Sequence, residues 1–130
     1  MTALNKTFII VGALSLTLAA ILSAYGFHGL ADDISPAKQL SWRWAVQMQT
    51  YHSLGLILIA ILSRQWNGSM LLKASGVLMI AGMLLFSGSI YAEILGAPEV
   101  FGQVAPIGGQ AFMLGWILVA VAAFLTPKSD

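Results

Sequence analysis

The residues of this sequence that could do chemistry are polar or ionisable side chains within long apolar segments. A polar side chain at membrane depth is energetically costly, so each one is a candidate functional residue. We expect a polar cluster of the following residues: Tyr25, His28, Gln49, Tyr51, His52, Ser87, Ser89 and Tyr91. Gln49 and His52 are one helical turn apart and share a helix face. The cluster either stabilises the packing of its helices or binds a lipid or a partner subunit.

The same residues do not form a recognisable catalytic or metal-binding pattern. The two histidines and the nearby Glu93 lie on three separate segments without metal-ligand spacing, so we expect no metal site. The absence of cysteine excludes disulfides and thiolate ligands, and no serine lies in a nucleophile motif. We therefore expect no cofactor, no catalytic residue and a non-enzymatic protein. A membrane enzyme acting on a lipid headgroup or a quinone would need Glu93 and His52 as an acid and base pair.

Composition identifies the elements that must position these residues. Of 130 residues, 58% are hydrophobic and 8% are charged, whereas soluble domains are about a quarter charged. Stretches of nearly 20 apolar residues, the length that crosses a bilayer, occur at about 8–27, 45–62, 70–95 and 107–125. The sequence therefore predicts one membrane domain over 1–130, an all-α integral membrane four-helix bundle. Ser35 and Pro36 are a helix-start signal, and we expect a short interfacial helix over 36–44 between the first two spans.

Small residues recur in these spans at positions where helices could pack closely. Ser75, Gly82 and Ser89 repeat every seven residues, a period that keeps one stripe facing a neighbouring helix. The expected helix-packing positions are Gly12, Ala19, Gly26, Gly82, Gly88, Gly108, Gly109 and Gly115. We expect Gly82→Leu and Gly88→Leu to disrupt this packing.

The charged residues predict an orientation. Lys6, Arg64, Lys73 and Lys128 fall on the side of both termini, and Lys38 and Arg43 fall on the other side. Basic residues favour the cytoplasmic side, which places both termini in the cytoplasm of a multi-pass protein. A net charge of +1 without a basic run excludes nucleic acid as a partner. The expected partners are membrane lipids, and a partner membrane protein or a homo-oligomer remains open.

Two roles remain open for His52. We expect the polar residues to lie in the outer half of the bundle, because the inner half has little beyond Ser15, Thr17, Ser75 and Lys73. A single chain would then lack polar groups for a continuous path across the membrane. In a structural role, His52 donates to Tyr91 or to a serine of the third span. The alternative is an oligomeric channel or transporter for protons or a small solute, with His52 as its titrating group.

Four motifs of the sequence resemble those of a known family. Residues 23–30 are similar to the Gly-Ala-Phe-Gly-Ala-His-x-Leu signature of a small bacterial inner-membrane family. Residues 46–54 resemble its Val-x-Tyr-Gln-Met-Tyr-His-x-Leu motif, residues 85–91 its Phe-Ser-Gly-Ser-x-Tyr motif, and residues 106–109 its Pro-x-Gly-Gly motif. The family is catalogued as domain of unknown function 423, with eukaryotic transmembrane protein 256 as a relative. The resemblance implies a four-helix protein of the bacterial inner (plasma) membrane and no established activity.

Overall fold

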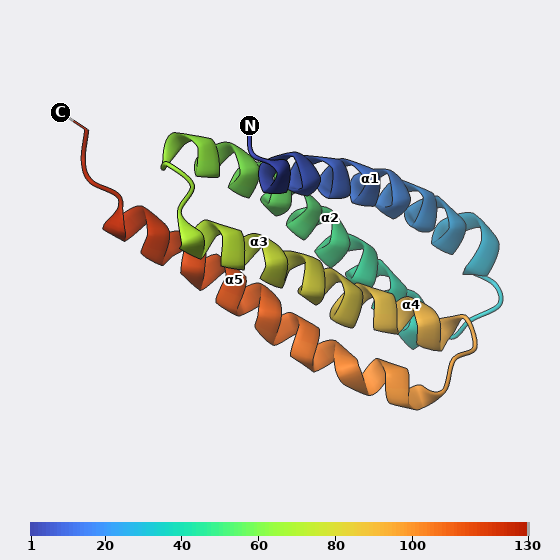
Figure 1. Ribbon diagram of the computed structural model, residues 1–130. Coiled ribbons are helices and arrows are strands. Elements are labelled where there is room, and N and C mark those ends of the chain that lie inside the picture. The colour runs from blue at the N-terminus through green and yellow to red at the C-terminus, as the bar shows by residue number, and fades with distance from the viewer. Residues whose placement is uncertain (130) are drawn as a thin grey trace.

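The computed structural model describes residues 1–129 as helices joined by short loops (Figure 1). Four helical segments are long and apolar enough to cross a membrane, namely Ala3–Leu30, Pro36–Gln65, Met70–Ile94 and Glu99–Leu125. The all-α fold with four candidate spans is therefore confirmed. The individual elements, in chain order, are α1 (Ala3–Tyr25), the π-helical η1 (Gly26–Leu30), α2 (Pro36–Gln65), α3 (Met70–Gly82), the π-helical η2 (Met83–Gly88), α4 (Ser89–Ile94), the 3₁₀-helical η3 (Glu99–Val104) and α5 (Ala105–Leu125).

Side-chain caps fix where the first two long helices begin. The hydroxyl of Thr2 accepts a hydrogen bond from the backbone N–H of Asn5, at 3.1 Å, and starts α1. The hydroxyl of Ser35 accepts from the backbone N–H of Lys38, at 3.3 Å, and Pro36 occupies the first turn of α2.

The expected short interfacial helix is not confirmed as a separate element. Residues 36–44 form the first turns of α2, which continues without a break to Gln65. Neither glycine nor proline occurs between 37 and 54, so nothing in the sequence ends the helix before the apolar segment starts. With 30 residues, α2 is about 45 Å long and exceeds the hydrocarbon thickness of about 30 Å.

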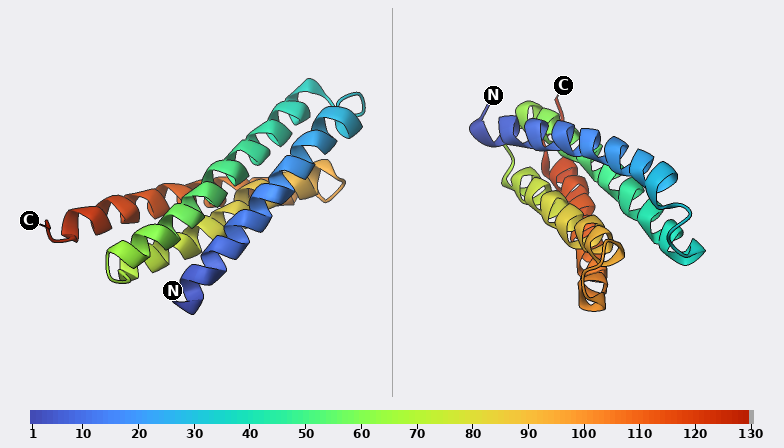
Figure 2. Two further views of the ribbon diagram at one scale, coloured as in Figure 1. Left: turned by 90° about the horizontal axis from the view of Figure 1, so that it is seen from above. Right: turned by 90° about the vertical axis from the view of Figure 1, so that its right-hand side faces the viewer.

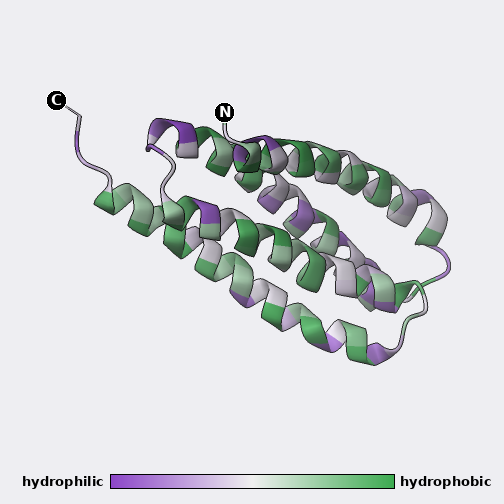
Figure 3. Ribbon diagram, in the orientation of Figure 1, coloured by the Kyte–Doolittle hydropathy of each residue, from purple (hydrophilic) through white to green (hydrophobic). Residues whose placement is uncertain are grey.

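The helices form two antiparallel pairs that pack on each other. Figures 1 and 2 show α1 beside α2, and α3 with α4 beside α5. We call the end of the bundle with both termini and the 66–69 turn the terminal end. We call the opposite end, with the 31–35 and 95–98 connections and η3, the loop end. Figure 3 shows hydrophilic residues mainly near these ends and apolar residues along much of α1, α3 and α5.

Small residues allow close approach at several helix crossings. A Cβ added to Gly12 would lie 2.8 Å from the backbone oxygen of Ser53, so α1 and α2 pack backbone to backbone there. A Cβ on Gly82 would overlap the Phe112 ring, and a Cβ on Gly108 would overlap the backbone of Phe86. The Ser75 hydroxyl also donates to the backbone oxygen of Gly115, at 2.7 Å. The contacts of Gly82, Gly108 and Ser75 thus hold α3 and η2 against α5.

The remaining expected packing positions that lie at close contacts are Ala19, Gly26 and Gly115. Ala19 is buried, and a Cβ on Gly26 would overlap the indole of Trp42. Gly115 lies under Met79, whose Cε would be 3.1 Å from an added Cβ.

Two expected packing positions do not mediate a close helix contact. The nearest atom to a Cβ on Gly88 is the oxygen of Met83 at 3.8 Å, and a Cβ on Gly109 would lie 3.9 Å from Phe86. Gly88 follows Gly82 by six residues, which is about 240° around a regular helix, so the two glycines do not share a face. A single added methyl group therefore has room at Gly88, and the effect of the larger side chain in Gly88→Leu stays a prediction. Gly76 makes such a contact instead, since a Cβ there would overlap the Phe8 ring.

Candidate functional site

Gln49 is the centre of a buried hydrogen-bond network that joins three parts of the bundle. Its side-chain nitrogen donates to the backbone oxygen and the hydroxyl of Ser15 on α1, at 3.0 and 3.2 Å. Its side-chain oxygen accepts from the hydroxyl of Tyr91 on α4, at 2.7 Å. Ser53 donates to the backbone oxygen of Gln49 at 2.6 Å and contacts the sulfur of Met83 at 3.3 Å. A buried amide placed in this way holds α1, α2 and α4 in one register.

Tyr91 connects this network to the aromatic residues of the loop end. Its ring lies 4.7 Å from the ring of Trp42, between centroids, and Trp42 lies 6.0 Å from Tyr25. The indole N–H of Trp42 donates to the backbone oxygen of Leu22, at 2.8 Å. Trp42 is thus fixed by a hydrogen bond to α1 and by ring contacts on both sides.

His52 belongs to a second cluster, formed with α5. Its Nδ1 lies 2.6 Å from the backbone oxygen of Met48, and its Nε2 accepts from the indole N–H of Trp116 at 3.1 Å. The ring stacks on Phe112 with centroids 3.5 Å apart. In the neutral tautomer with its proton on Nδ1, Nδ1 donates a hydrogen bond and Nε2 accepts one, so both ring nitrogens have a partner. The expected hydrogen bond from His52 to Tyr91 or a serine of the third span is wrong, because Tyr91 pairs with Gln49.

The serines of the third span bond to backbone oxygens. The Ser87 hydroxyl donates to the oxygen of Ala45 on α2, at 2.6 Å. The Ser89 hydroxyl donates to the oxygens of Leu85 and Phe86 within its own helical segment. Ser87 therefore joins η2 to α2, while Ser89 only satisfies local backbone groups.

The other expected cluster members lie outside the buried network. Tyr51 is 53% exposed, Tyr25 contacts Trp42 with a largely exposed ring, and His28 is exposed beside Phe27. The structure therefore joins Gln49 to Tyr91 and places His52 in a neighbouring cluster. Ser87 and Ser89 bond to backbone oxygens outside this pair, and Tyr51 and His28 lie apart.

Glu93 and His52 have different neighbours. The Glu93 carboxylate lies against Gly102 of η3, whereas the imidazole faces Trp116 and Phe112. Among residues 1–129, no group of three or more histidine, cysteine, aspartate or glutamate side chains could hold a metal ion.

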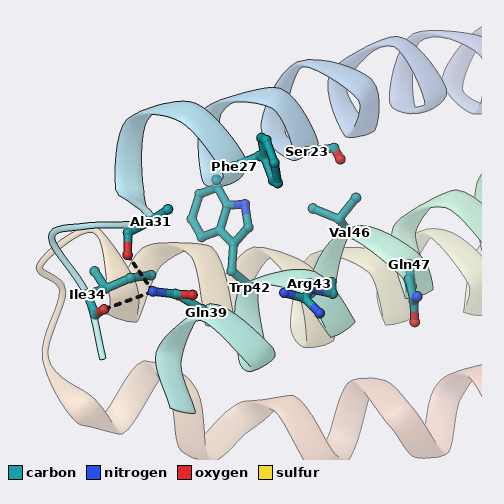
Figure 4. Close-up of a pocket in the computed structure, with 10 residues that line it drawn as sticks. Ser23, Phe27, Ala31, Ile34, Gln39, Trp42, Arg43, Val46 and Gln47 are labelled. Carbon is teal, nitrogen blue, oxygen red and sulfur yellow. Dashed lines mark hydrogen bonds between the residues drawn. The ribbon is translucent and has the colours of Figure 1, made fainter. Parts of the chain in front are cut away.

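A pocket of about 380 Å³ opens at the loop end between α1 with η1 and the start of α2 (Figure 4). Phe27, Ile34 and Val46 supply apolar walls, and the buried Trp42 separates this pocket from Tyr91. Gln39 closes one side by donating to the backbone oxygens of Ala31 and Ile34. Arg43 adds an exposed positive charge. The chemistry of this lining suits an amphiphile with an apolar body and a polar head.

Sequence reasoning missed the tryptophans as site residues and two polar residues of the terminal end. Trp42 and Trp116 supply the N–H donors described above. They were missed because tryptophan is common at the membrane interface whether or not it donates a hydrogen bond inside the bundle. Asn5 and Ser63 are buried, which adds polar groups to the half of the bundle expected to be nearly apolar. The weak signal was the position of both residues at the ends of apolar segments next to Lys6 and Arg64.

Comparisons with known proteins identify relatives over most of the chain. A family model described as "Protein of unknown function (DUF423)" matches residues 22–109. The UPF0382 membrane protein YwdK of Bacillus subtilis is 43% identical over 119 residues, which cover 91% of this chain and 96% of that protein. A UPF0382 membrane protein of Staphylococcus aureus is 40% identical over 92% of this chain and 96% of its own length. No solved structure matches. These names describe membrane proteins and include no enzyme.

Proposed function

The chain belongs to the DUF423 family of membrane proteins, as its four motifs indicated, and on that premise we propose that it is a non-enzymatic lipid-binding protein. Its lipid site is the pocket at the loop end, lined by Phe27, Ile34, Trp42, Arg43 and Val46. The hydrogen bond between Gln49 and Tyr91 holds Trp42, which forms one wall of this pocket, in its position. The protein resides in the bacterial inner membrane with both termini in the cytoplasm.

The observation that carries this proposal is the connection between the pocket and the hydrogen-bond network. Trp42 lines the pocket, contacts the ring of Tyr91 and donates to Leu22. Tyr91 in turn is held by Gln49, which bonds to α1 through Ser15. Because a buried network with its partners in place rigidifies its surroundings, the wall has a defined shape.

The lining of the pocket favours a membrane lipid as its occupant. Apolar side chains outnumber polar ones, and the volume of about 380 Å³ lies within the range of sites for small ligands. Arg43 can pair with a phosphate or carboxylate, because its planar guanidinium donates two parallel hydrogen bonds to such groups. A partner subunit inserting a side chain is the competing occupant.

Lipid retention in mild detergent tests the proposal. The protein is purified from membranes in a maltoside detergent, and its bound lipids are quantified by mass spectrometry. Val46→Phe fills the pocket and should reduce the retained lipid severalfold. The control Val77→Phe makes the same change on an exposed face of α3 and should retain lipid like the wild type. Equal retention by both variants, or a copurifying protein in place of lipid, contradicts lipid binding at this pocket.

The oligomeric channel or transporter remains a separate hypothesis with its own test. It requires His52 to exchange protons, whereas both of its ring nitrogens have partners within the bundle. Proton or solute flux into liposomes that is abolished by His52→Ala, with the fold retained, would favour a channel. Absence of flux agrees with the lipid-binding role.

A further inference from the structure

Two polar side chains at the terminal end are buried and have an atom with no hydrogen-bond partner among residues 1–129. Asn5 on α1 is 3% exposed and Ser63 on α2 is 2% exposed. The side-chain oxygen of Asn5 and the hydroxyl of Ser63 each lack a partner. An unpaired buried polar atom costs about 1–3 kcal/mol, so such atoms in a folded protein indicate a missing ligand or a specific role.

Both residues line one pocket of about 400 Å³ between the start of α1, the end of α2 and the start of α3. Arg64 from the last turn of α2 and the half-buried Lys73 from the first turns of α3 also line it. The exposed Thr2 and Asn67 complete its polar rim. Two positively charged side chains and two buried polar groups without a partner therefore line the same pocket.

The charges of residues 1–129 are distributed unevenly between the two ends. Lys6, Arg64, Lys73 and Lys128 lie on the segments of the terminal end. Within residues 1–129 every acidic residue belongs to the loop end: Asp32, Asp33, Glu93 and Glu99. An anion entering the pocket at the terminal end thus meets positive charge without a competing carboxylate in the described chain.

We propose that this pocket binds a phosphate group, with Arg64 and Lys73 neutralising its charge and Ser63 and Asn5 completing its hydrogen bonds. The Ser63 hydroxyl can donate to a phosphate oxygen. The amide of Asn5 can donate through its nitrogen after a half-turn about its terminal bond, which exchanges the positions of its oxygen and nitrogen. The phosphate can belong to an anionic phospholipid headgroup or to a free phosphate. This site is separate from the lipid pocket of the loop end in its residues and in its place along the bundle.

The test measures the thermal stability of the purified full chain in a neutral detergent with three probes. Phosphatidylglycerol supplies an anionic headgroup, phosphatidylcholine supplies the same phosphodiester with a compensating cation, and inorganic phosphate supplies the free ion. We expect phosphatidylglycerol to raise Tm in a saturable manner, since a ligand that binds only the folded state stabilises it. A similar rise with inorganic phosphate, and its competition with the lipid, would assign the site to a free phosphate.

Two variants and one matched control separate the site from general attraction between charges. Ser63→Ala removes an unpartnered hydroxyl, so the lipid-free protein should keep or gain thermal stability while its affinity for phosphatidylglycerol falls about tenfold. Lys73→Gln should weaken binding at least as much. Lys128→Gln removes the same charge at the same end but outside this pocket, and should leave the affinity within about twofold of the wild type.

Three results would overturn the proposal. The first is no saturable effect of phosphatidylglycerol or inorganic phosphate on the wild type. The second is equal stabilisation by phosphatidylcholine and phosphatidylglycerol that is unchanged in Ser63→Ala and Lys73→Gln, which would assign the effect to acyl chains or to the loop-end pocket. The third is equal loss of affinity in Lys73→Gln and Lys128→Gln together with no loss in Ser63→Ala.

Discussion

The indole N–H of Trp116 on α5 donates to Nε2 of His52 on α2, and this bond fixes the protonation pattern of the imidazole. A nitrogen that accepts a hydrogen bond must offer a lone pair, so the ring proton resides on Nδ1. That proton is directed to the backbone oxygen of Met48, 2.6 Å away. The ring is also stacked on Phe112. His52 therefore joins α2 to α5 through one donor, one acceptor and one ring face.

This geometry predicts the tautomer of His52. Nitrogen chemical shifts in the solid-state NMR spectrum of the protein in lipid bilayers should show a neutral ring with a protonated Nδ1 and an unprotonated Nε2. In Trp116→Phe, Nε2 loses its donor, so its resonance should shift while the resonance of the exposed His28 stays in place. A wild-type spectrum with the proton on Nε2 contradicts the assignment.

Gln49 and Tyr91 should be coupled in stability. Gln49→Leu and Tyr91→Phe each remove one partner of the hydrogen bond between α2 and α4. Buried bonds of this kind in membrane proteins contribute about 0.6 kcal/mol on average and up to about 1.7 kcal/mol. The double variant should lose less unfolding free energy than the sum of the two single losses, as measured by reversible unfolding in mixed micelles. Tyr51→Phe, at an exposed position, is the control and should have little effect. Strict additivity of the two losses would show that the bond contributes nothing.

Gly82 and Gly88 should respond differently to alanine. The added methyl group at Gly82 overlaps the Phe112 ring, and moving that ring costs about 1–3 kcal/mol. At Gly88 the methyl group has room, and replacing a helical glycine stabilises a helix by about 0.5–1 kcal/mol. Thermal unfolding in detergent should therefore show a lower Tm for Gly82→Ala and an equal or higher Tm for Gly88→Ala. The reverse order would contradict the packing of α3 on α5.

The orientation can be tested directly because the sequence contains no cysteine. A single cysteine in place of Asp33, in the connection at the loop end, should react with a membrane-impermeant maleimide in spheroplasts. A single cysteine in place of Ser129 should react only after the membrane is opened, because the orientation proposed from the basic residues places the terminal end in the cytoplasm. Labelling in the opposite order would place both termini outside.

The spans were predictable because hydropathy over some 20 residues depends on composition more than on neighbours. The start of α2 was also predictable, since Ser35 and Pro36 act locally. Its unbroken length was not, because tryptophan and arginine near an interface fit both a separate helix and an extension of the span. The absence of a helix-breaking residue between 37 and 54 was the signal that decided between them.

The partners of the polar residues depend on helix rotation, which a single sequence does not specify. The spacing of Gln49 and His52 predicts that they share a helix face, and both are buried. Which neighbour each one meets depends on the rotation of α4 and α5 about their own axes. This is why Tyr91 bonds to Gln49, and Trp116 rather than Tyr91 bonds to His52. The pocket that holds Asn5 and Ser63 likewise requires three helix ends to be placed together.

The third span has two different buried faces, one before η2 and one within and after it. In an α-helix each residue turns the chain by about 100°, so Ser87 and Tyr91, which follow Gly82 by five and nine residues, lie about 140° and about 180° around the helix axis from it. Before η2, Ser75 and Gly82 are directed at α5; within and after it, Ser87 and Tyr91 are directed at α2. Deleting a single residue between Gly82 and Tyr91 would turn Tyr91 by about 100° about the helix axis and move it away from Gln49 without altering the hydropathy of the span. The span thus tolerates exchange of one apolar residue for another far better than it tolerates a change in its length.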